Sequence, residues 1–458
     1  MGAIGISGWA ARVPRGAGVR GQLRAGGRRA ALGAILATLG LAAAGCGATP
    51  ATTAGGHRHR PPVIRVVLWE SHLAGPVGNA VAALASQFNA SHTNVRLSLN
   101  VTSASTKALG AFEAGHPPLL AEISHYDNSF VSAHALLSLN RFMYGARGLT
   151  RAQWATYDPV FLANGEVGGQ HYRLMAGMKV SQLTFNQTLL QAAGITSPPA
   201  TWAALYTDLK ILKAKDPQVI PLAWKNSSAH EIPPFLSNGG EIFKPGSHDT
   251  RTDWNSPAGV QTFDFFRMLY RQGLMIFSHG ATIRADLAAG KLAIGDGTSA
   301  GYAKALDAVA GKFPVGVWPY PAGSSGHSAN LAQGLGFVIM VDHSPAQDAA
   351  AWEVIKWLLS PKPMAYWSMH TGFAAVSAGA RALIPSSFMA SHPGIAVSNA
   401  EAASPHTIAR PIPAAYAEVQ SALDTAFFNA VTGRESVSRA LAALDATDHK
   451  YLTSASGL

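Results

Sequence analysis

Apolar positions change their period along the chain from Val63 onward. Residues 63–69 form an apolar run rich in β-branched side chains, which predicts a strand buried in a parallel sheet. Apolar residues then recur at helical spacing over residues 77–88, after a Gly-Pro loop, and residues 95–101 alternate as a strand does. A strand, a helix and a strand with short joints predict a βαβ unit.

The same alternation continues through the rest of the chain. Residues 119–123 and 182–186 have the pattern of further strands. Ser256-Pro257 and Ser344-Pro345 each place an N-cap residue before a proline at the first helical position, so both predict helix starts. Helices and strands that alternate in this way predict an α/β architecture. No short-period repeat is visible, which disfavours a solenoid.

Four segments between about Val63 and Leu452 resemble extracellular solute-binding protein family 1 in their order and spacing. This family holds sugar-binding lipoproteins of ABC importers, among them maltose-binding and glycerol-3-phosphate-binding proteins. The segments are Leu183–Gln187 with Pro198–Trp202, Leu236–Phe243 with Asn255–Pro257, Gly290–Ile294, and Ala351–Leu358 with Thr371–Phe373. One such motif alone is a weak signal, whereas four in order are specific.

The resemblance implies a two-lobed α/β fold of the periplasmic-binding-protein type, with a hinge and a cleft between the lobes. We expect residues 63–178 with 315–368 in lobe I, and residues 179–314 with 369–458 in lobe II. A small-molecule solute in the cleft would shift the hinge toward a closed form. The resemblance further implies that this closed form docks on the permease subunits of an ABC importer, without a cofactor.

The match is closest to the glycerol-3-phosphate-binding branch, and it implies which residues contact the solute. Ser181 and Lys179 also lie beside the expected first crossing between the lobes, from which they could reach the cleft. Residue type alone leaves alternatives open, because Trp224 also fits core packing, and Arg410 and Asp127 also fit surface positions. The residues implied by the resemblance are Trp224, Ser299 or Thr298 beside it, Gly334, Arg410, and Tyr126 and Asp127 with His125 as an alternative.

The class of solute stays open at this level. Sugar sites need flat aromatic surfaces together with amides and carboxylates, whereas a phosphate needs arginine or backbone N–H groups. The second glycine that the branch carries beside Gly334 is replaced here by Gln333, and the acidic position corresponds to His125. The sequence therefore predicts a sugar or a glycerol-3-phosphate-type solute.

Composition supports a folded body and removes one class of partner. Hydrophobic residues make up 48% of the 458 residues, enough for a large core, and one cysteine cannot form an internal disulfide. The formal net charge is +10, but six of the 35 basic residues precede residue 46, where no acid occurs. The remainder carries 29 basic and 25 acidic residues without a dense basic run, which argues against nucleic-acid binding.

The N-terminal segment has the features of a secretory signal. Six arginines precede the apolar run of residues 30–44, which is shorter than the roughly 20 residues of a membrane span. Cys46 follows Ala44-Gly45 and resembles the lipid-modified cysteine of a bacterial lipobox, although Ala43 stands where that motif usually has leucine. We expect a signal peptide over residues 1–45, a flexible tether over 46–62, and a lipoprotein anchored at Cys46 to the outer face of the cell membrane.

One catalytic motif supports an alternative function. Residues 297–301 fit G-x-S-x-G, the nucleophile elbow of α/β-hydrolases, so the alternative function is a secreted esterase using Ser299. No convincing oxyanion segment precedes the motif, and the family resemblance accounts for the same serine. No HExxH motif or close cluster of metal ligands is visible either. We therefore expect a non-enzymatic binding protein with no metal site.

Overall fold

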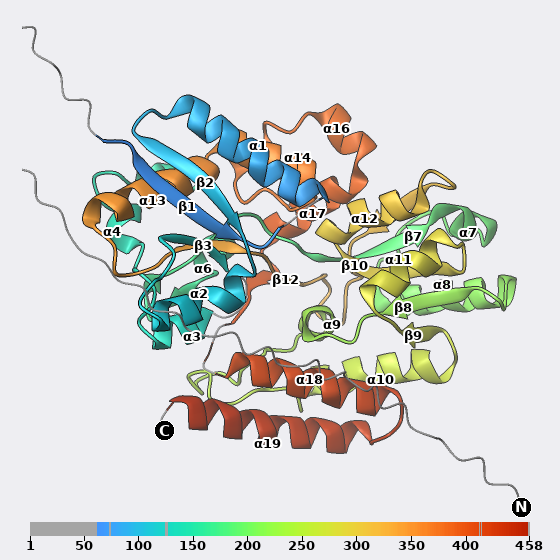
Figure 1. Cartoon of the computed structure of the whole chain (residues 1–458). Helices are drawn as coiled ribbons and strands as arrows, with labels where there is room; N and C mark the ends of the chain where they lie inside the picture. The colour runs from blue at the N-terminus through green and yellow to red at the C-terminus, as the bar shows by residue number, and fades with distance from the viewer. Residues whose placement is uncertain (1–61, 73–74, 124–126, 412, 414, 457–458) are drawn as a thin grey trace, which may run out of the picture. The chain divides into compact units, whose positions relative to one another are not determined.

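The computed structural model describes residues 62–72, 75–123, 127–411, 413 and 415–456 (Figure 1). The predictions for the signal peptide, for Cys46, for the tether up to residue 61 and for Tyr126 fall outside these residues. Within the described part of the chain, no helix has the length and apolar character needed to cross a membrane.

The first sheet has five strands in the order β2-β1-β3-β13-β6. β1, β2 and β3 run parallel, and β13 is antiparallel to both β3 and β6. The predicted βαβ unit is confirmed, because α1 (Gly75–Ser91) connects β1 to β2. The strands are β1 (Ile64–Glu70), β2 (Val95–Val101), β3 (Leu120–Ile123), β6 (Leu174–Met175) and β13 (Gly336–Ile339).

Helices far apart in sequence cover the first sheet. α1 packs against α13 (Pro345–Leu358) and α14 (Pro361–Thr371), and their apolar faces share one core with the sheet (Figure 1). α13 begins as the Ser-Pro pattern predicts, because Ser344 caps it with a reciprocal bond to Gln347. One fully buried tryptophan, Trp352, anchors α13 in this core.

The second sheet also has five strands, in the order β11-β7-β10-β8-β9. β10, β8 and β9 run parallel, whereas β7 is antiparallel to both β10 and β11. The strands are β7 (Ser181–Asn186), β8 (Ile220–Trp224), β9 (Met275–Phe277), β10 (Leu292–Thr298) and β11 (Val315–Trp318).

A second, aromatic-rich core lies against this sheet. α8 (Trp202–Lys215) and α10 (Pro257–Arg271) join α18 (Tyr416–Val431) and α19 (Val437–Ser456) around it (Figure 1). Ser256 caps α10 ahead of Pro257, as predicted. Rings pack at short range here, for instance Trp224 and Phe266 with centroids 4.6 Å apart.

The remaining elements are short helices and strands that connect the two sheets or pad their edges. They are α2 (Ala104–Glu113), α3 (Asp127–Ser132), α4 (Asn140–Met143), α5 (Arg151–Trp154), α6 (Pro159–Ala163), β4 (Glu166–Val167), β5 (Gln170–His171), α7 (Gln187–Ala192), α9 (Ser228–Ser237), α11 (Gly280–Ala288), α12 (Ser299–Val309), β12 (Asn330–Ala332), α15 (Ala378–Arg381), α16 (Ser386–Ser391), α17 (Pro393–Ala403) and β14 (Thr407–Ala409).

The strand pairing moves two of the expected lobe limits. Residues 315–318, expected in lobe I, form β11. This strand pairs antiparallel with β7 and therefore belongs to the second sheet. Residues after 368, expected in lobe II, still pack in the first core, where Phe373, Ile384 and Ile395 are buried. The chain therefore crosses between the sheets at 176–180, at 319–335 and after residue 403.

Candidate functional site

A polar cleft with a volume of about 680 Å³ lies where the chain crosses between the two sheets. This volume is within the range of roughly 300–1,000 Å³ that is typical of small-molecule sites. His72 reaches it from the end of β1, Lys225 from the end of β8, and Lys179 and Gln333 from the crossing segments. Carboxyl ends of parallel strands thus face the cleft, the usual place for ligands in open α/β sheets.

The cleft is strongly basic. Among the described residues that line it, Asp424 is the only carboxylate and Phe373 is the only phenyl, phenol or indole ring. Burial, together with the neighbouring charges of Arg410, Lys225 and Lys304, lowers the pKa of Lys179 to about 8. A cation whose charge is disfavoured by other cations gains stability when an anion arrives. The five cations of the cleft are Lys179, Lys225, Arg284, Lys304 and Arg410.

A chain of buried polar groups holds Lys225 in place. Its Nζ lies 3.5 Å from His230 Nε2, and His230 Nδ1 lies 2.8 Å from Asp296 Oδ1. Tyr320 donates its hydroxyl proton to the same Asp296 oxygen at 2.5 Å, and Lys225 donates its backbone N–H to the other oxygen at 3.1 Å. His230, Asp296 and Tyr320 are all less than 5% exposed. We call these four residues the lysine relay.

The protonation of the lysine relay follows from its geometry. Burial is the largest influence on His230 and lowers the pKa of its ring, which favours the neutral form. A neutral ring carries one N–H, and the Asp296 carboxylate can only accept, so Nδ1 holds the proton. Nε2 is then an acceptor for the Lys225 ammonium group. The relay therefore fixes the lysine's direction without neutralising its charge.

Two further carboxyl groups lie in the wall formed by α9 and α18. Asp424 accepts the backbone N–H of Ser228 at 2.5 Å, and burial raises the pKa of Asp424 to about 6. Behind it, Glu231 is 2% exposed, and neither of its carboxyl oxygens has a hydrogen-bond partner. Burial, followed by the nearby charge of Asp424, raises the pKa of Glu231 well above its usual range. This wall thus carries less negative charge near neutral pH than its composition suggests.

Backbone pairing fixes the floor of the cleft. Lys179 and Gln333 exchange two backbone hydrogen bonds of 2.7 and 3.1 Å between the two crossing segments. Gly334 follows directly, and a Cβ there would lie 2.4 Å from the carbonyl oxygen of Gly177. Only glycine allows this close approach of two backbones. Gly334 lines the cleft, and its contact with the solute stays a prediction.

Arg410, Thr298 and Lys179 also line the cleft, whereas Trp224 does not. The structure corrects the placement of Trp224, which is fully buried in the second core with its ring stacked on Tyr320 at 5.4 Å. Strand alternation explains the difference, because Trp224 ends β8 on the helix-covered face and the next residue, Lys225, turns into the cleft.

Ser181 and Ser299 lie beneath the cleft surface instead of on it. Ser181 has no exposed area and donates its hydroxyl to the Ala229 carbonyl at 3.1 Å. Ser299 is 2% exposed, and its Oγ accepts the backbone N–H of Val180 at 3.4 Å. Both serines therefore stabilise the backbone around the crossings. Asp127 begins α3, and its side chain lies outside the described part of the structure.

Sequence reasoning missed several lining residues, namely His72, Lys225, Arg284 and Lys304. Each is a polar residue next to the carboxyl end of a strand or on a helix flanking one, so a search of strand ends could have found Lys225 and His72. Arg284 and Lys304 lie inside α11 and α12, where a charged residue has the pattern of an ordinary solvated helix face.

A two-lobed α/β body with a polar cleft at the crossings between its sheets defines a protein that binds a small solute between two lobes. The chain belongs to the bacterial extracellular solute-binding protein family, whose sequence profile matches residues 83–445. The family resemblance inferred from the sequence and the two-lobed fold are thereby confirmed.

Proteins that are similar to this chain in sequence or in structure agree with this assignment. The sn-glycerol-3-phosphate-binding periplasmic protein UgpB of Pectobacterium atrosepticum is 21% identical over 340 residues, which cover 69% of this chain and 74% of that protein. The cyclic α-maltosyl-1,6-maltose binding protein of Arthrobacter globiformis superposes with a TM-score of 0.74 at 20% identity, over 86% of this chain and all of that one. UgpB of Mycobacterium tuberculosis, solved with glycerophosphocholine, gives 0.72 at 18% identity, over 85% and 98%.

At these identities the solved structures establish the fold alone. They give the esterase alternative no support, and the geometry of Ser299 agrees. In the described part of the chain, no histidine forms a hydrogen bond with its hydroxyl, which a nucleophilic serine requires of its general base.

Proposed function

We propose that this protein is the substrate-binding component of an ABC importer and that its solute is a small phosphorylated polyol. The observation that carries the proposal is the charge of the cleft, where five cations face one carboxylate. Maltose-type sugars need aromatic platforms, and the described lining offers only Phe373. The relative from Pectobacterium atrosepticum that is named for sn-glycerol-3-phosphate supports the same solute class.

Lys225 and Arg410 have the chemistry to bind the phosphate group. Arginine offers a bidentate donor fork, and a lysine held by the relay offers a directed point charge. Gln333, Thr298 and Gln420 supply amide and hydroxyl groups for the hydroxyls of a polyol. The site thus has a charged half and a neutral polar half, which suits a molecule with one phosphate and several hydroxyls.

Transport would follow from closure of the two lobes. A solute that contacts both lobes stabilises the closed form by the difference in its affinity for the two forms. Lys225 lies on the second lobe and His72 on the first, so a solute between them would bring the lobes together. The closed form would then deliver the solute to permease subunits in the membrane.

A ligand panel tests the proposal. We expect sn-glycerol 3-phosphate and glycerophosphocholine to raise the melting temperature and to bind in calorimetry, whereas maltose and trehalose have no effect. Lys225→Met should weaken phosphate binding by about 10- to 100-fold, because a hydrogen bond to a charged group contributes roughly 1.5–3 kcal/mol.

Lys291→Met is the matched control, since Lys291 is exposed at the start of β10 and does not line the cleft. It should bind as the wild type does. Stabilisation by maltose or trehalose without any response to the phosphates would contradict the proposed solute class.

The location of the protein is a separate proposal. A lipid on Cys46 would hold the protein near its permease and raise its effective concentration there. Replacing Cys46 by serine should release soluble protein that binds its solute with unchanged affinity. Release measured by cell fractionation supports the anchor, and retention of the Cys46→Ser protein in the membrane fraction contradicts it.

A further inference from the structure

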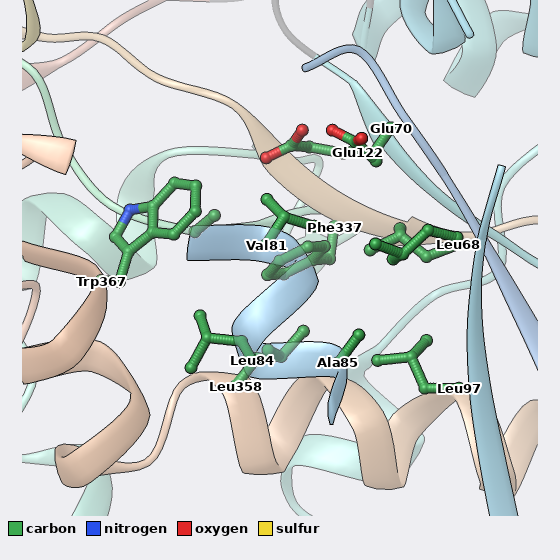
Figure 2. Close-up of a pocket in the computed structure, with 12 residues that line it drawn as sticks. Leu68, Glu70, Val81, Leu84, Ala85, Leu97, Glu122, Phe337, Leu358 and Trp367 are labelled. Carbon is green, nitrogen blue, oxygen red and sulfur yellow. The ribbon is translucent and has the colours of Figure 1, made fainter. Parts of the chain in front are cut away.

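Three potential metal ligands converge at the end of the first sheet. Glu70 ends β1 and Glu122 lies in β3, and the parallel register that pairs Trp69 with Ala121 places the two glutamates side by side. Their carboxylates face one another above an apolar cavity (Figure 2). His72 follows β1 by two residues and turns back toward both. We call these residues the Glu-His-Glu cluster.

The distances within the cluster suit a metal ion. One donor atom from each residue lies within 4.8 Å of the other two. His72 Nδ1 lies 3.3 Å from Oε2 of Glu70 and 3.3 Å from Oε2 of Glu122. Ligands held at roughly 2.0–2.1 Å in a tetrahedron around zinc lie about 3.3 Å apart, so both nitrogen–oxygen distances match a tetrahedron's edge.

Two of these three donor atoms have no hydrogen-bond partner. They are His72 Nδ1 and Glu122 Oε2, both buried, whereas Glu70 Oε2 accepts the backbone N–H of His72 at 2.7 Å. The ring nitrogen lies equally far from both carboxylates, so neither oxygen holds it alone. This is the arrangement expected of donors that share a common point, and Glu122 as a whole is 2% exposed.

Charge balance gives a further reason for a cation. Glu70 and Glu122 are 1% and 2% exposed, and the cavity beside them is otherwise lined by apolar side chains. In the described part of the chain, no lysine or arginine forms an ion pair with either carboxylate. Two buried carboxylates and one imidazole carry a net negative charge, which is unfavourable away from water unless it is compensated.

We propose that the Glu-His-Glu cluster binds one divalent transition-metal ion of the zinc, cobalt or manganese type. One imidazole nitrogen and two carboxylate oxygens suit these ions, whereas calcium prefers six to eight oxygen ligands. His72 is the member that lines the cleft, so the ion enters from there and its remaining position faces the solute. A phosphate oxygen can occupy that position, an inference that rests on the proposed function.

This site revises the expectation from sequence that no metal ligands gather. Residues 70 and 72 are separated from residue 122 by about 50 positions, so no short motif reveals them. They meet only because β1 and β3 are neighbours in the sheet.

Cobalt titration of the full secreted chain tests the proposal. The protein is stripped with a chelator, and His57→Asn with His59→Asn removes two further histidines near the N-terminus from every sample. We expect one equivalent of Co²⁺ to give the visible absorption of a low-symmetry, four- or five-coordinate ion, and Zn²⁺ to displace it.

Glu122→Gln should weaken Co²⁺ binding by about 100-fold, since it removes a ligand that carries charge. His72→Asn tests a less buried member and should weaken binding at least tenfold. Glu166→Gln is the matched control, because Glu166 also faces a histidine, His171 at 3.7 Å, without a third ligand, and it should bind as the wild type does.

Wild-type affinity for Co²⁺ that equals that of a folded Glu122→Gln or His72→Asn variant would overturn the proposal. The titration contains no solute, so its result does not depend on the proposed transport function. Repeating the glycerol 3-phosphate titration with Zn²⁺ present tests only whether a phosphate oxygen binds the metal ion. Unchanged phosphate affinity would contradict that contact but not the metal site itself.

Discussion

The two sheets place buried carboxylates at equivalent positions, the carboxyl ends of parallel strands, yet surround them differently. In the second sheet, Asp296 accepts hydrogen bonds from the Lys225 backbone N–H, His230 and Tyr320, so both of its carboxylate oxygens have donors. In the first, Glu70 and Glu122 share a single histidine. The comparison shows that carboxylates at the same topological position can be well supplied with hydrogen-bond donors in one sheet and left with few donors in the other.

Removing the carboxylate of Asp296 should have the largest effect. Asp296→Ala leaves the Tyr320 hydroxyl, His230 Nδ1 and the Lys225 backbone N–H without their shared acceptor, so the free energy of unfolding should fall by about 3–5 kcal/mol. Urea unfolding followed by circular dichroism measures this. Asp307→Ala, at an exposed site on α12, should change it by less than about 0.5 kcal/mol. Equal stability of the two variants would show that the relay adds nothing to folding.

A buried acid with few donors sharpens the comparison. Asp448 accepts the indole N–H of Trp254 at 2.8 Å on Oδ2, whereas its Oδ1 has no hydrogen-bond partner among the described residues. Burial raises the pKa of Asp448 to about 7. A carboxyl whose folded pKa is raised contributes stability at pH values below its unfolded pKa, and this contribution is lost as the pH rises through the folded pKa. The free energy of unfolding of the wild type should therefore fall by about 4 kcal/mol between pH 4 and pH 8 through this group.

Asp448→Asn should flatten that part of the pH–stability curve, and urea unfolding at each pH measures it. Asp264→Asn, on the exposed face of α10, serves as the control with the wild-type slope. If the free energy of unfolding of Asp448→Asn falls with pH as steeply as that of the wild type, other groups cause the pH dependence.

The smallest expected effect concerns the single carboxylate of the cleft. Because the pKa of Asp424 is raised to about 6, protonation between pH 7 and pH 5 makes the cleft more positive. Affinity for glycerophosphocholine, whose phosphodiester does not titrate in this range, should rise about threefold over that interval. Asp424→Asn should bind at pH 7 as tightly as the wild type does at pH 5. Isothermal titration at both pH values decides between a rise and no change.

Much of the fold could be predicted from the sequence because it depends on local patterns. The β1–α1–β2 unit and the caps at Ser256 and Ser344 follow from residues within a few positions of one another. The limits of the lobes were harder to predict from the sequence. β11 belongs to the second sheet only because it pairs with β7, which lies more than 120 residues earlier in the chain.

The candidate site was only partly accessible from the sequence, and solute contact stays a prediction for every residue named there. Gly334 and Arg410 line the cleft, whereas Trp224 is in the core because the side of a strand that faces the cleft depends on its register. The lysine relay joins residues 225, 230, 296 and 320, and no local spacing indicates that they meet. Buried polar clusters of this kind are products of the tertiary fold.

The position of β13 has a consequence for how the chain acquires its structure. This strand lies between β3 and β6, although it follows β6 by about 160 residues in the sequence. The first sheet therefore stays incomplete until residue 339 is available, and the open edges of β3 and β6 remain exposed during synthesis. The N-terminal half of the chain therefore cannot finish folding early, because its sheet closes only when distant segments meet.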